Sequence, residues 1–310
     1  MLRWRLLLGT LFIAALVGLC WLDYRAAWPG VYLLPLALVV SLLGAGELLA
    51  MFRKRGYEPL AWVIYGGTAL AVLLASAPGL LPATWSTSAT GQLGWLAIGL
   101  AAGSLLAMLG ELWRFKSPGQ ATTNLALSCF AILYAGGLMG FLIQLRILGG
   151  DHWGTDGRWG MLALISLIAT VKMSDTGQYT AGRLFGRHKL SPIVSPGKTW
   201  EGAAGGFVFA VIAASIVFGW AARQVVGAAS ETTHSYASPG GIFRILVFSA
   251  ALTAAGIIGD LTESLLKRDA GVKDSSTWLP GFGGVLDLLD SLLGAAPVAY
   301  VLWALGLIGP

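Results

Sequence analysis

The sequence predicts an all-α integral membrane protein that crosses the bilayer several times. Hydrophobic residues make up 56% of its 310 residues and charged residues only 11%, whereas soluble domains carry about a quarter charged residues. Apolar stretches recur along the whole chain, each long enough to cross roughly 30 Å of hydrocarbon as a helix of about 20 residues. The chain therefore belongs to the polytopic membrane class.

About nine membrane-spanning stretches can be placed. The first has a basic start and an apolar core, but no small-x-small cleavage site follows, so we expect a retained membrane helix and not a signal peptide. The sixth is the shortest and ends against Lys172 and Asp175, which predicts a partial or broken span. The stretches lie near Leu6–Leu22, Val31–Phe52, Leu60–Leu80, Leu93–Leu112, Ala121–Leu145, Trp159–Met173, Gly202–Ala222, Gly241–Ile258 and Leu289–Ile308.

The basic residues between these stretches predict the orientation. When alternate loops are counted from the N-terminus, one side holds 15 of the 20 Lys and Arg residues and the other side holds five. The positive-inside rule then places the N-terminus in the cytoplasm and, with an odd number of spans, the C-terminus outside. Two long polar loops, 174–200 and 259–288, would both face the cytoplasm. Because the basic residues lie in short loops, their excess does not indicate nucleic-acid binding.

The chain reads as one membrane domain with two regions. Residues 1–150 hold about five spans, and residues 151–310 hold the remaining spans and both polar loops, which makes this second region the candidate catalytic one. Cys20 and Cys129 both fall within apolar stretches. We expect them to be small buried hydrophobic side chains and not a disulfide or a metal pair.

The segment from Gly259 to Ser291 concentrates six acidic and three basic residues between apolar stretches. Charge beside a bilayer is energetically costly, so this cluster indicates chemistry. If the preceding helix continues past Gly259, Asp260, Glu263, Ser264 and Lys267 share one face of it. In a soluble helix such a stripe is more typical of a solvated ion-pair face, but here it emerges from the membrane, which favours a functional role.

Three basic residues follow in the same segment. Lys267, Arg268 and Lys273 lie within seven positions. They could anchor the loop to anionic lipid or hold a phosphate. The two interpretations are compatible if the substrate is itself an anionic lipid.

A glycine-rich turn then leads into the last apolar stretch. Its glycines permit close approach of the backbone, and the new helix N-terminus offers N–H groups to an anion. Asp287 and Asp290 lie in the first turn of that helix. Helix capping explains one of them, whereas two carboxylates at i and i+3 favour a Mg²⁺ site completed by water and substrate phosphate.

The earlier polar loop carries a weaker signal. Ser195, Lys198 and Thr199 precede a helix expected to begin near Trp200, and this mixture of hydroxyl, glycine and ammonium groups is typical of a phosphate cradle, without the spacing of a Walker A loop. His188 lies between Arg187 and Lys189 and is expected to belong to a basic surface. Glu47 and Glu111 lie near the ends of spans, where they reach the aqueous interface or line a cavity between helices.

Together these motifs resemble the phosphatidate cytidylyltransferases, membrane enzymes that make CDP-diacylglycerol. The family pattern of Ser, Lys-Arg, Lys-Asp, Pro, Gly-Gly and paired Asp, the Ser-Pro-Gly-Lys-Thr run and the Gly-Asp-Leu-x-Glu-Ser run all occur. The matching residues are Asp175, Gly177, Ser195, Pro196, Gly197, Lys198, Thr199, Glu201, Gly202, Gly259, Asp260, Leu261, Glu263, Ser264, Lys267, Arg268, Lys273, Asp274, Pro280, Gly283, Gly284, Asp287 and Asp290. Phe282 and Leu288 depart from the family, which usually has His and Arg there, and we expect these two positions to tune the pocket.

The resemblance implies a reaction in which the phosphate of phosphatidic acid attacks the α-phosphorus of CTP and releases pyrophosphate. It implies a Mg²⁺ centre, with a K⁺ ion beside it, and a homodimer. By resemblance, Asp260, Asp287, Lys267 and Lys198 are the catalytic residues. Asp260 and Asp287 are the expected metal ligands, with Asp290 and Glu263 nearby. The expected substrate-binding residues are Arg268, Lys273, Asp274, Ser264, Ser195, Gly283, Gly284, Asp175 and Glu201.

Two alternatives remain open from the sequence. One is a sister chemistry, such as a CTP-dependent polyprenol or phytol kinase or a cytidylyltransferase for another lipid phosphate. The other is a transporter with charged gates. Transporters often show internal repeats and charges in the middle of spans, and neither feature is evident in this sequence.

Overall fold

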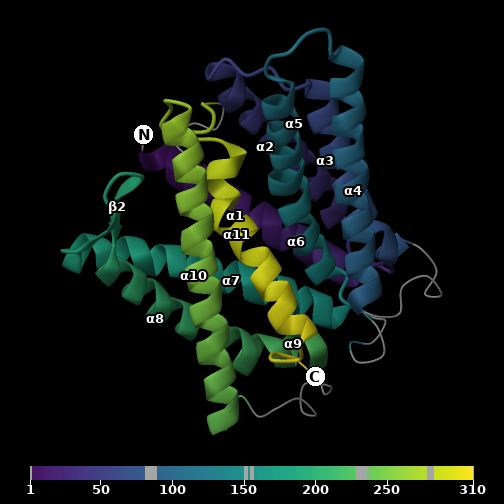
Figure 1. Cartoon of the computed structure of the whole chain (residues 1–310). Helices are drawn as coiled ribbons and strands as arrows, with labels where there is room; N and C mark the ends of the chain where they lie inside the picture. Colours follow the sequence, from purple (N-terminus) through teal and green to yellow (C-terminus); the bar gives the residue numbers. More distant parts are fainter. Residues whose placement is uncertain are drawn as a thin grey trace. The chain divides into compact units, whose positions relative to one another are not determined.

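The computed structural model describes residues 2–80, 89–149, 153, 157–227, 236, 238–277 and 283–309 (Figure 1). It confirms an all-α polytopic architecture. Seven helical stretches within the described residues are long and apolar enough to cross a membrane. They correspond to seven of the nine expected spans: Leu33–Lys54, Ala61–Leu80, Gly91–Arg114, Ala121–Arg146, Trp200–Val226, Pro239–Asp269 and Val285–Ala304.

The two other expected spans coincide with helices α1 (Leu2–Arg25) and α7 (Arg158–Phe185). The total of nine spans and the positions of the two termini relative to the membrane stay predictions. Short π-helical segments, η2 (Ile132–Gly137) and η3 (Val217–Ala221), interrupt two of the spans. The remaining helices are α2 (Leu33–Lys54), α3 (Ala61–Leu80), α4 (Ala89–Arg114), α5 (Ala121–Ala131), α6 (Leu138–Arg146), α8 (Trp200–Ile216), α9 (Ala222–Val226), α10 (Pro239–Asp269) and α11 (Val285–Ala304).

The chain divides into two compact units, and the division of residues 1–150 from 151–310 stays a prediction. One unit comprises Met1–Ile147 with Leu266–Leu289, and the other comprises Leu148–Leu265 with Asp290–Pro310. Each unit has its own packed interior.

In the first unit, α2 to α5 run side by side (Figure 1). Val63, Ala71, Ala107 and Ile132 form a buried cluster between α3, α4 and η2. Small residues allow this packing, because a Cβ added to Gly103 would press on Ile132 and on the backbone of α3. Close approach of backbones through small residues is the usual way in which membrane helices associate, because lipid gives no hydrophobic drive for helices to pair.

A buried ion pair joins the C-terminal ends of α1 and α6 in the same unit. The Arg146 Nε lies 2.5 Å from the Asp23 Oδ2. The Asp23 carboxylate also accepts hydrogen bonds from the backbone N–H groups of Gly30 and Tyr32 at 3.0 and 2.9 Å. Arg146 is therefore a buried structural residue at the end of α6.

In the second unit, α7 packs along α8 through glycines on both helices. A Cβ on Gly177 would lie 2.6 Å from the Gly205 carbonyl oxygen, and one on Gly206 would lie 2.5 Å from the Gln178 side chain. The two helices are joined by an antiparallel hairpin of β1 (Lys189–Ser191) and β2 (Ser195–Thr199). The hairpin thus holds the Ser-Pro-Gly-Lys-Thr run at the junction of α7 and α8.

Both polar segments begin as helix. The expected loop 174–200 has its first twelve residues in α7, then the hairpin, and α8 begins at Trp200 as expected. In the expected loop 259–288, α10 continues past Gly259 to Asp269, so the condition under which Asp260, Ser264 and Lys267 share one helix face is met. Each of these helices continues for several polar residues beyond its apolar stretch. Hydropathy alone therefore could not show where the helix ended.

Candidate functional site

In the second unit, Lys198 and Asp260 form an ion pair. The Lys198 Nζ, at the end of the hairpin, lies 2.7 Å from the Asp260 Oδ2. On the same helix the Ser264 hydroxyl donates to the Asp260 Oδ1 at 3.3 Å, as the i, i+4 spacing predicts. The structure therefore brings together three residues of two motifs that lie more than sixty positions apart.

Close packing of α10 against the second-unit part of α11 brings Asp290 near Asp260. A Cβ on Gly259 would lie 3.0 Å from the Gly294 Cα and even closer to the Asp290 carbonyl oxygen. Only glycine permits these backbones to approach so closely. The buried Asp290 carboxylate accepts hydrogen bonds from the backbone N–H of Ser291, at 2.5 Å, and from its hydroxyl, at 3.1 Å.

Asp175, from α7, is a third carboxylate in the same neighbourhood. Asp260 and Asp175 both act electrostatically on Asp290. Burial raises the pKa of the Asp175 carboxyl, while the Lys172 ammonium, 3.4 Å away, opposes this shift. Three carboxylates near enough to repel one another are a favourable setting for a hard divalent cation, which prefers oxygen ligands.

These three carboxylates do not lie close enough together to form one coordination shell. Within the part of the chain that the structure describes, no group of three or more His, Cys, Asp or Glu side chains has the closeness of a formed metal site. The donor atoms fit Mg²⁺ in chemical type, because Mg²⁺ takes one or two carboxylates and completes its shell with water and phosphate.

Other expected site residues of the second unit have structural contacts. Glu201 lies in the first turn of α8, where its carboxylate lies 2.6 Å from the His188 Nδ1 and accepts from the backbone N–H groups of Arg187 and His188. Glu201 therefore joins the start of α8 to the residues just before the hairpin. Ser195 pairs with Ser191 at the start of β2. Glu263 is fully buried in α10.

In the first unit, Asp287 is surrounded by donors. Its Oδ1 lies 2.5 Å from the Lys267 Nζ. Its Oδ2 accepts from the backbone N–H groups of Gly284 and Ser275, at 2.8 and 2.9 Å, and lies 2.7 Å from the Ser275 Oγ. Gly283 has a φ of +85°, a left-handed conformation that favours glycine, and a side chain there would strike the Asp287 carboxylate.

Glu47 caps the N-terminus of α11. Its two carboxylate oxygens accept from the backbone N–H groups of Val285 and Leu286 at 2.8 and 3.0 Å, and one of them also lies 2.8 Å from the Ser275 Oγ. The N–H groups expected to receive a ligand anion are thus bonded to a carboxylate of the protein. Glu47 and Glu111 are both buried, and Glu111 pairs with Arg114 at 3.1 Å.

The remaining expected residues of this unit lie at its surface or outside the described part. Arg268, Lys273 and Asp274 are exposed. Leu288 is half-buried in α11, and Phe282 lies outside the described residues together with Pro280. The structure thus forms two groups of expected residues, one in each unit. The Asp260 cluster comprises Asp175, Lys198, Asp260, Ser264 and Asp290. The Asp287 cluster comprises Lys267, Gly283, Gly284 and Asp287.

A model of the cytidylyltransferase family matches residues 4–305. The chain belongs to this family. It is 40% identical over 156 residues to a phosphatidate cytidylyltransferase of Haemophilus influenzae, covering 50% of this chain and 49% of the relative. It is also 40% identical over 144 residues to a Pseudomonas aeruginosa protein of the same name, covering 46% and 48%.

A Brucella suis phosphatidate cytidylyltransferase is 37% identical over 163 residues, which is 53% of each chain. The chain thus spans about half the length of the curated relatives it matches. The family match covers the Asp260 and Asp287 clusters together with the helices that hold them.

The sequence of this cytidylyltransferase family member carries no signal for the structural contacts of two residues, Glu47 and Ser275. The sequence shows Glu47 as an acid near the end of a span, but its bond to α11, more than two hundred positions away, has no local signal. Ser275 lies between the carboxylates of Glu47 and Asp287, and no motif in the sequence marks it. A hydroxyl in a polar segment is too common for its type alone to indicate such a contact.

Proposed function

We propose that the protein is a phosphatidate cytidylyltransferase that converts CTP and phosphatidic acid to CDP-diacylglycerol and pyrophosphate. The observation that carries the proposal is the Lys198–Asp260 pair with Asp290 alongside, in a chain of the cytidylyltransferase family. A lysine beside two carboxylates offers both a phosphate ligand and metal ligands, which are what a transfer between two anionic substrates requires.

The proposed reaction joins a phosphate oxygen of phosphatidic acid to the α-phosphorus of CTP. The bond from the α-phosphorus to the bridging oxygen breaks, and pyrophosphate leaves. The attacking phosphate is already an anion, so no strong general base is needed. Such transfers depend on alignment and neutralisation of charge.

Asp260 and Asp290 are the proposed ligands for Mg²⁺ in the second unit. When bound, the cation would neutralise charge on the triphosphate and polarise its α-phosphate. Lys198 would leave Asp260 and bind phosphate oxygens, because its ammonium is a mobile point charge on a flexible stem. Ser264 would keep the Asp260 carboxylate oriented.

The residues of the first unit have complementary proposed roles. The exposed Lys273 and Arg268 would bind phosphates at the surface. The Asp287 carboxylate holds Lys267, the backbone of Ser275 and the start of α11 in a fixed arrangement, and its role as a metal ligand stays a prediction of the family resemblance. So do the K⁺ ion and the homodimer.

We further propose that the protein lies in the cytoplasmic membrane of a bacterial cell, with its polar segments facing the cytoplasm. The strong asymmetry of Lys and Arg between alternate loops supports this orientation. CTP is then reached from the cytoplasm and phosphatidic acid from the inner leaflet.

The experiment is an assay of the purified full chain with CTP, Mg²⁺ and phosphatidic acid in mixed micelles. We expect pyrophosphate release and formation of CDP-diacylglycerol, and loss of both on adding EDTA. Asp260→Asn should abolish the reaction, whereas Asp269→Asn, which removes an exposed carboxylate of the same helix, should not. Phosphorylation of a free lipid alcohol with release of CDP, and no reaction of phosphatidic acid, would establish the kinase alternative instead.

A further inference from the structure

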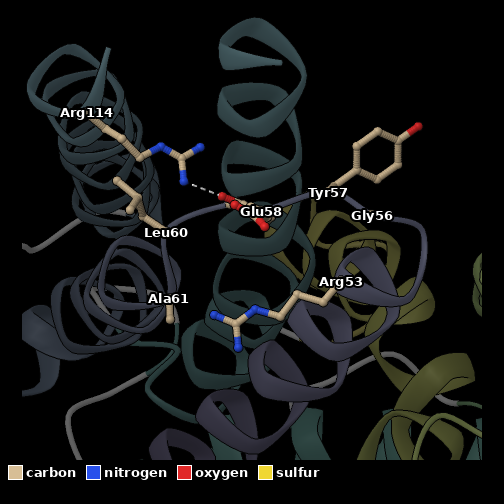
Figure 2. Close-up of a pocket in the computed structure, with 8 residues that line it drawn as sticks. Arg53, Gly56, Tyr57, Glu58, Leu60, Ala61 and Arg114 are labelled. Atoms are coloured by element: carbon tan, nitrogen blue, oxygen red, sulfur yellow. Dashed lines mark hydrogen bonds between the residues drawn. The ribbon is translucent and has the colours of Figure 1, made fainter. Parts of the chain in front are cut away.

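A pocket of about 480 Å³ opens in the first unit, where α2 and α4 end and α3 begins (Figure 2). Its volume falls within the range of about 300–1,000 Å³ that is typical of small-molecule sites. Arg53 of α2, Glu58 of the following loop and Arg114 of α4 contribute to its wall. None of these residues belongs to the Asp260 or Asp287 clusters.

Two opposite charges in this wall do not pair with each other. Within the described part of the chain, the Arg53 guanidinium and the Glu58 carboxylate make no hydrogen bond or ion pair. Arg114, by contrast, is engaged: its side chain pairs with Glu111 at 3.1 Å and donates to the Glu58 carbonyl oxygen at 2.6 Å. The charge left for a ligand is therefore one cation and one anion, separated across a single pocket.

The wall that carries Glu58 is held in place. The Glu58 backbone N–H donates to the Asn124 Oδ1 at 3.1 Å. Its carbonyl oxygen accepts from Arg114, as Figure 2 shows. The next residue, Pro59, is buried and has a fixed φ. A pocket fixed in advance loses less conformational entropy when a ligand binds.

The residues around the pocket support a position at the level of lipid headgroups. Trp113 beside Arg114 is 84% exposed, and Phe115 and Trp62 are also exposed. Exposed aromatic side chains at the ends of spanning helices are typical of the membrane–water interface. Leu105, Leu109 and Leu112 are exposed along α4, so acyl chains could lie along the helix that leads to the pocket.

We propose that this pocket binds the headgroup of a zwitterionic phospholipid that carries a phosphate and a primary ammonium group. The Arg53 guanidinium would bind the phosphate by charge-assisted hydrogen bonds, and the Glu58 carboxylate would bind the ammonium. Exposed leucines and aromatic residues would contact the tails. This proposal is independent of the proposed catalytic function, since it uses other residues and requires no turnover.

The test measures lipid binding to the purified full chain in detergent by native mass spectrometry. The probes are dioctanoyl phosphatidylethanolamine, dioctanoyl phosphatidylglycerol, which lacks the amine, and O-phosphoethanolamine, which lacks the tails. We expect phosphatidylethanolamine to bind most tightly. Arg53→Gln should weaken its binding about tenfold or more, and Glu58→Gln should reduce it to the level of phosphatidylglycerol. Lys54→Gln, which removes an exposed cation outside the pocket, should bind both lipids as the unchanged protein does.

Several outcomes would overturn the proposal. Equal affinity of the unchanged protein for phosphatidylethanolamine and phosphatidylglycerol would show that the amine is not recognised. Unchanged binding of phosphatidylethanolamine by Arg53→Gln would show that this pocket is not the lipid-binding site. Equally tight binding of O-phosphoethanolamine would mean a soluble phosphate compound, not a lipid, is the ligand. The retained phosphatidylglycerol binding of Glu58→Gln serves as the check that this variant is folded.

Discussion

The Lys267 ammonium lies 2.5 Å from the Asp287 Oδ1, which joins the end of α10 to the first turn of α11. Both side chains are largely shielded from solvent. The second oxygen of Asp287 accepts from the backbone N–H groups of Ser275 and Gly284. The Asp287 carboxylate, for which the sequence predicts a metal-binding or helix-capping role, is therefore the centre of a structural network.

Asp287→Asn tests this double role. We expect turnover to be lost and the free energy of unfolding to fall by about 1–3 kcal/mol, because an amide cannot pair with Lys267 and leaves buried donors poorly satisfied. Thermal unfolding in detergent, measured beside pyrophosphate release, separates the two effects. Asp269→Asn, at an exposed position of the same region, is the matched control. Full stability in the Asp287 variant would show that the network contributes little.

Lys198→Ala should act through the Asp260 cluster. It removes the ammonium that lies 2.7 Å from Asp260 and, by our proposal, a ligand of the triphosphate. We expect kcat/KM for CTP to fall about 100-fold or more, as for other losses of transition-state charge stabilisation, with partial rescue in Lys198→Arg. The assay should be run over a range of Mg²⁺ concentrations. Unchanged kinetics at every concentration would exclude Lys198 from substrate binding.

Lys273→Ala provides a contrast within the same motif. Lys273 is exposed, so its removal should leave the unfolding temperature unchanged. By our proposal it binds a substrate phosphate, and KM for CTP or phosphatidic acid should rise about tenfold while kcat changes little. A KM equal to that of the unchanged protein for both substrates would argue against this role.

The sequence predicted most of the membrane architecture because hydropathy is a local signal. Seven expected spans, such as the one at Leu60–Leu80, have matching helices in the structure. The i, i+4 relation of Asp260 and Ser264 was also readable, because helical spacing fixes it. Where helices extended beyond their apolar part, as α7 does to Phe185, the polar residues concealed the true end.

Contacts between distant segments could not be predicted in the same way. The Glu47 bond to α11 depends on how α2 packs, and the hairpin that presents Lys198 depends on Glu201 binding the backbone at Arg187. Both contacts join residue types that are common in polar segments. Composition and spacing give candidates for such pairs but do not select among them.

Glu47→Gln tests the cap on α11. The carboxylate accepts from two backbone N–H groups and lies within hydrogen-bond distance of the Ser275 hydroxyl, whereas a glutamine side chain has a single acceptor oxygen. We expect the free energy of unfolding to fall by about 1–3 kcal/mol, and Glu47→Ala to lower it further. Asp269→Asn, which changes an exposed carboxylate of the same unit, is the control. Equal stability of Glu47→Gln and the control would show that the cap is dispensable.

Gly259→Ala tests whether close helix packing positions the Asp260 cluster. A Cβ there would overlap the Asp290 carbonyl oxygen and lie 3.0 Å from the Gly294 Cα. Because neither backbone atom can rotate away, we expect α10 and α11 to separate locally, at a loss of about 1–3 kcal/mol in stability. Turnover should fall with it, since Asp260 and Asp290 would move apart. Gly94→Ala, where an added Cβ meets nothing within 4 Å, should leave activity and unfolding temperature unchanged. If both variants behave alike in these two measurements, the glycine contact does not position the carboxylates.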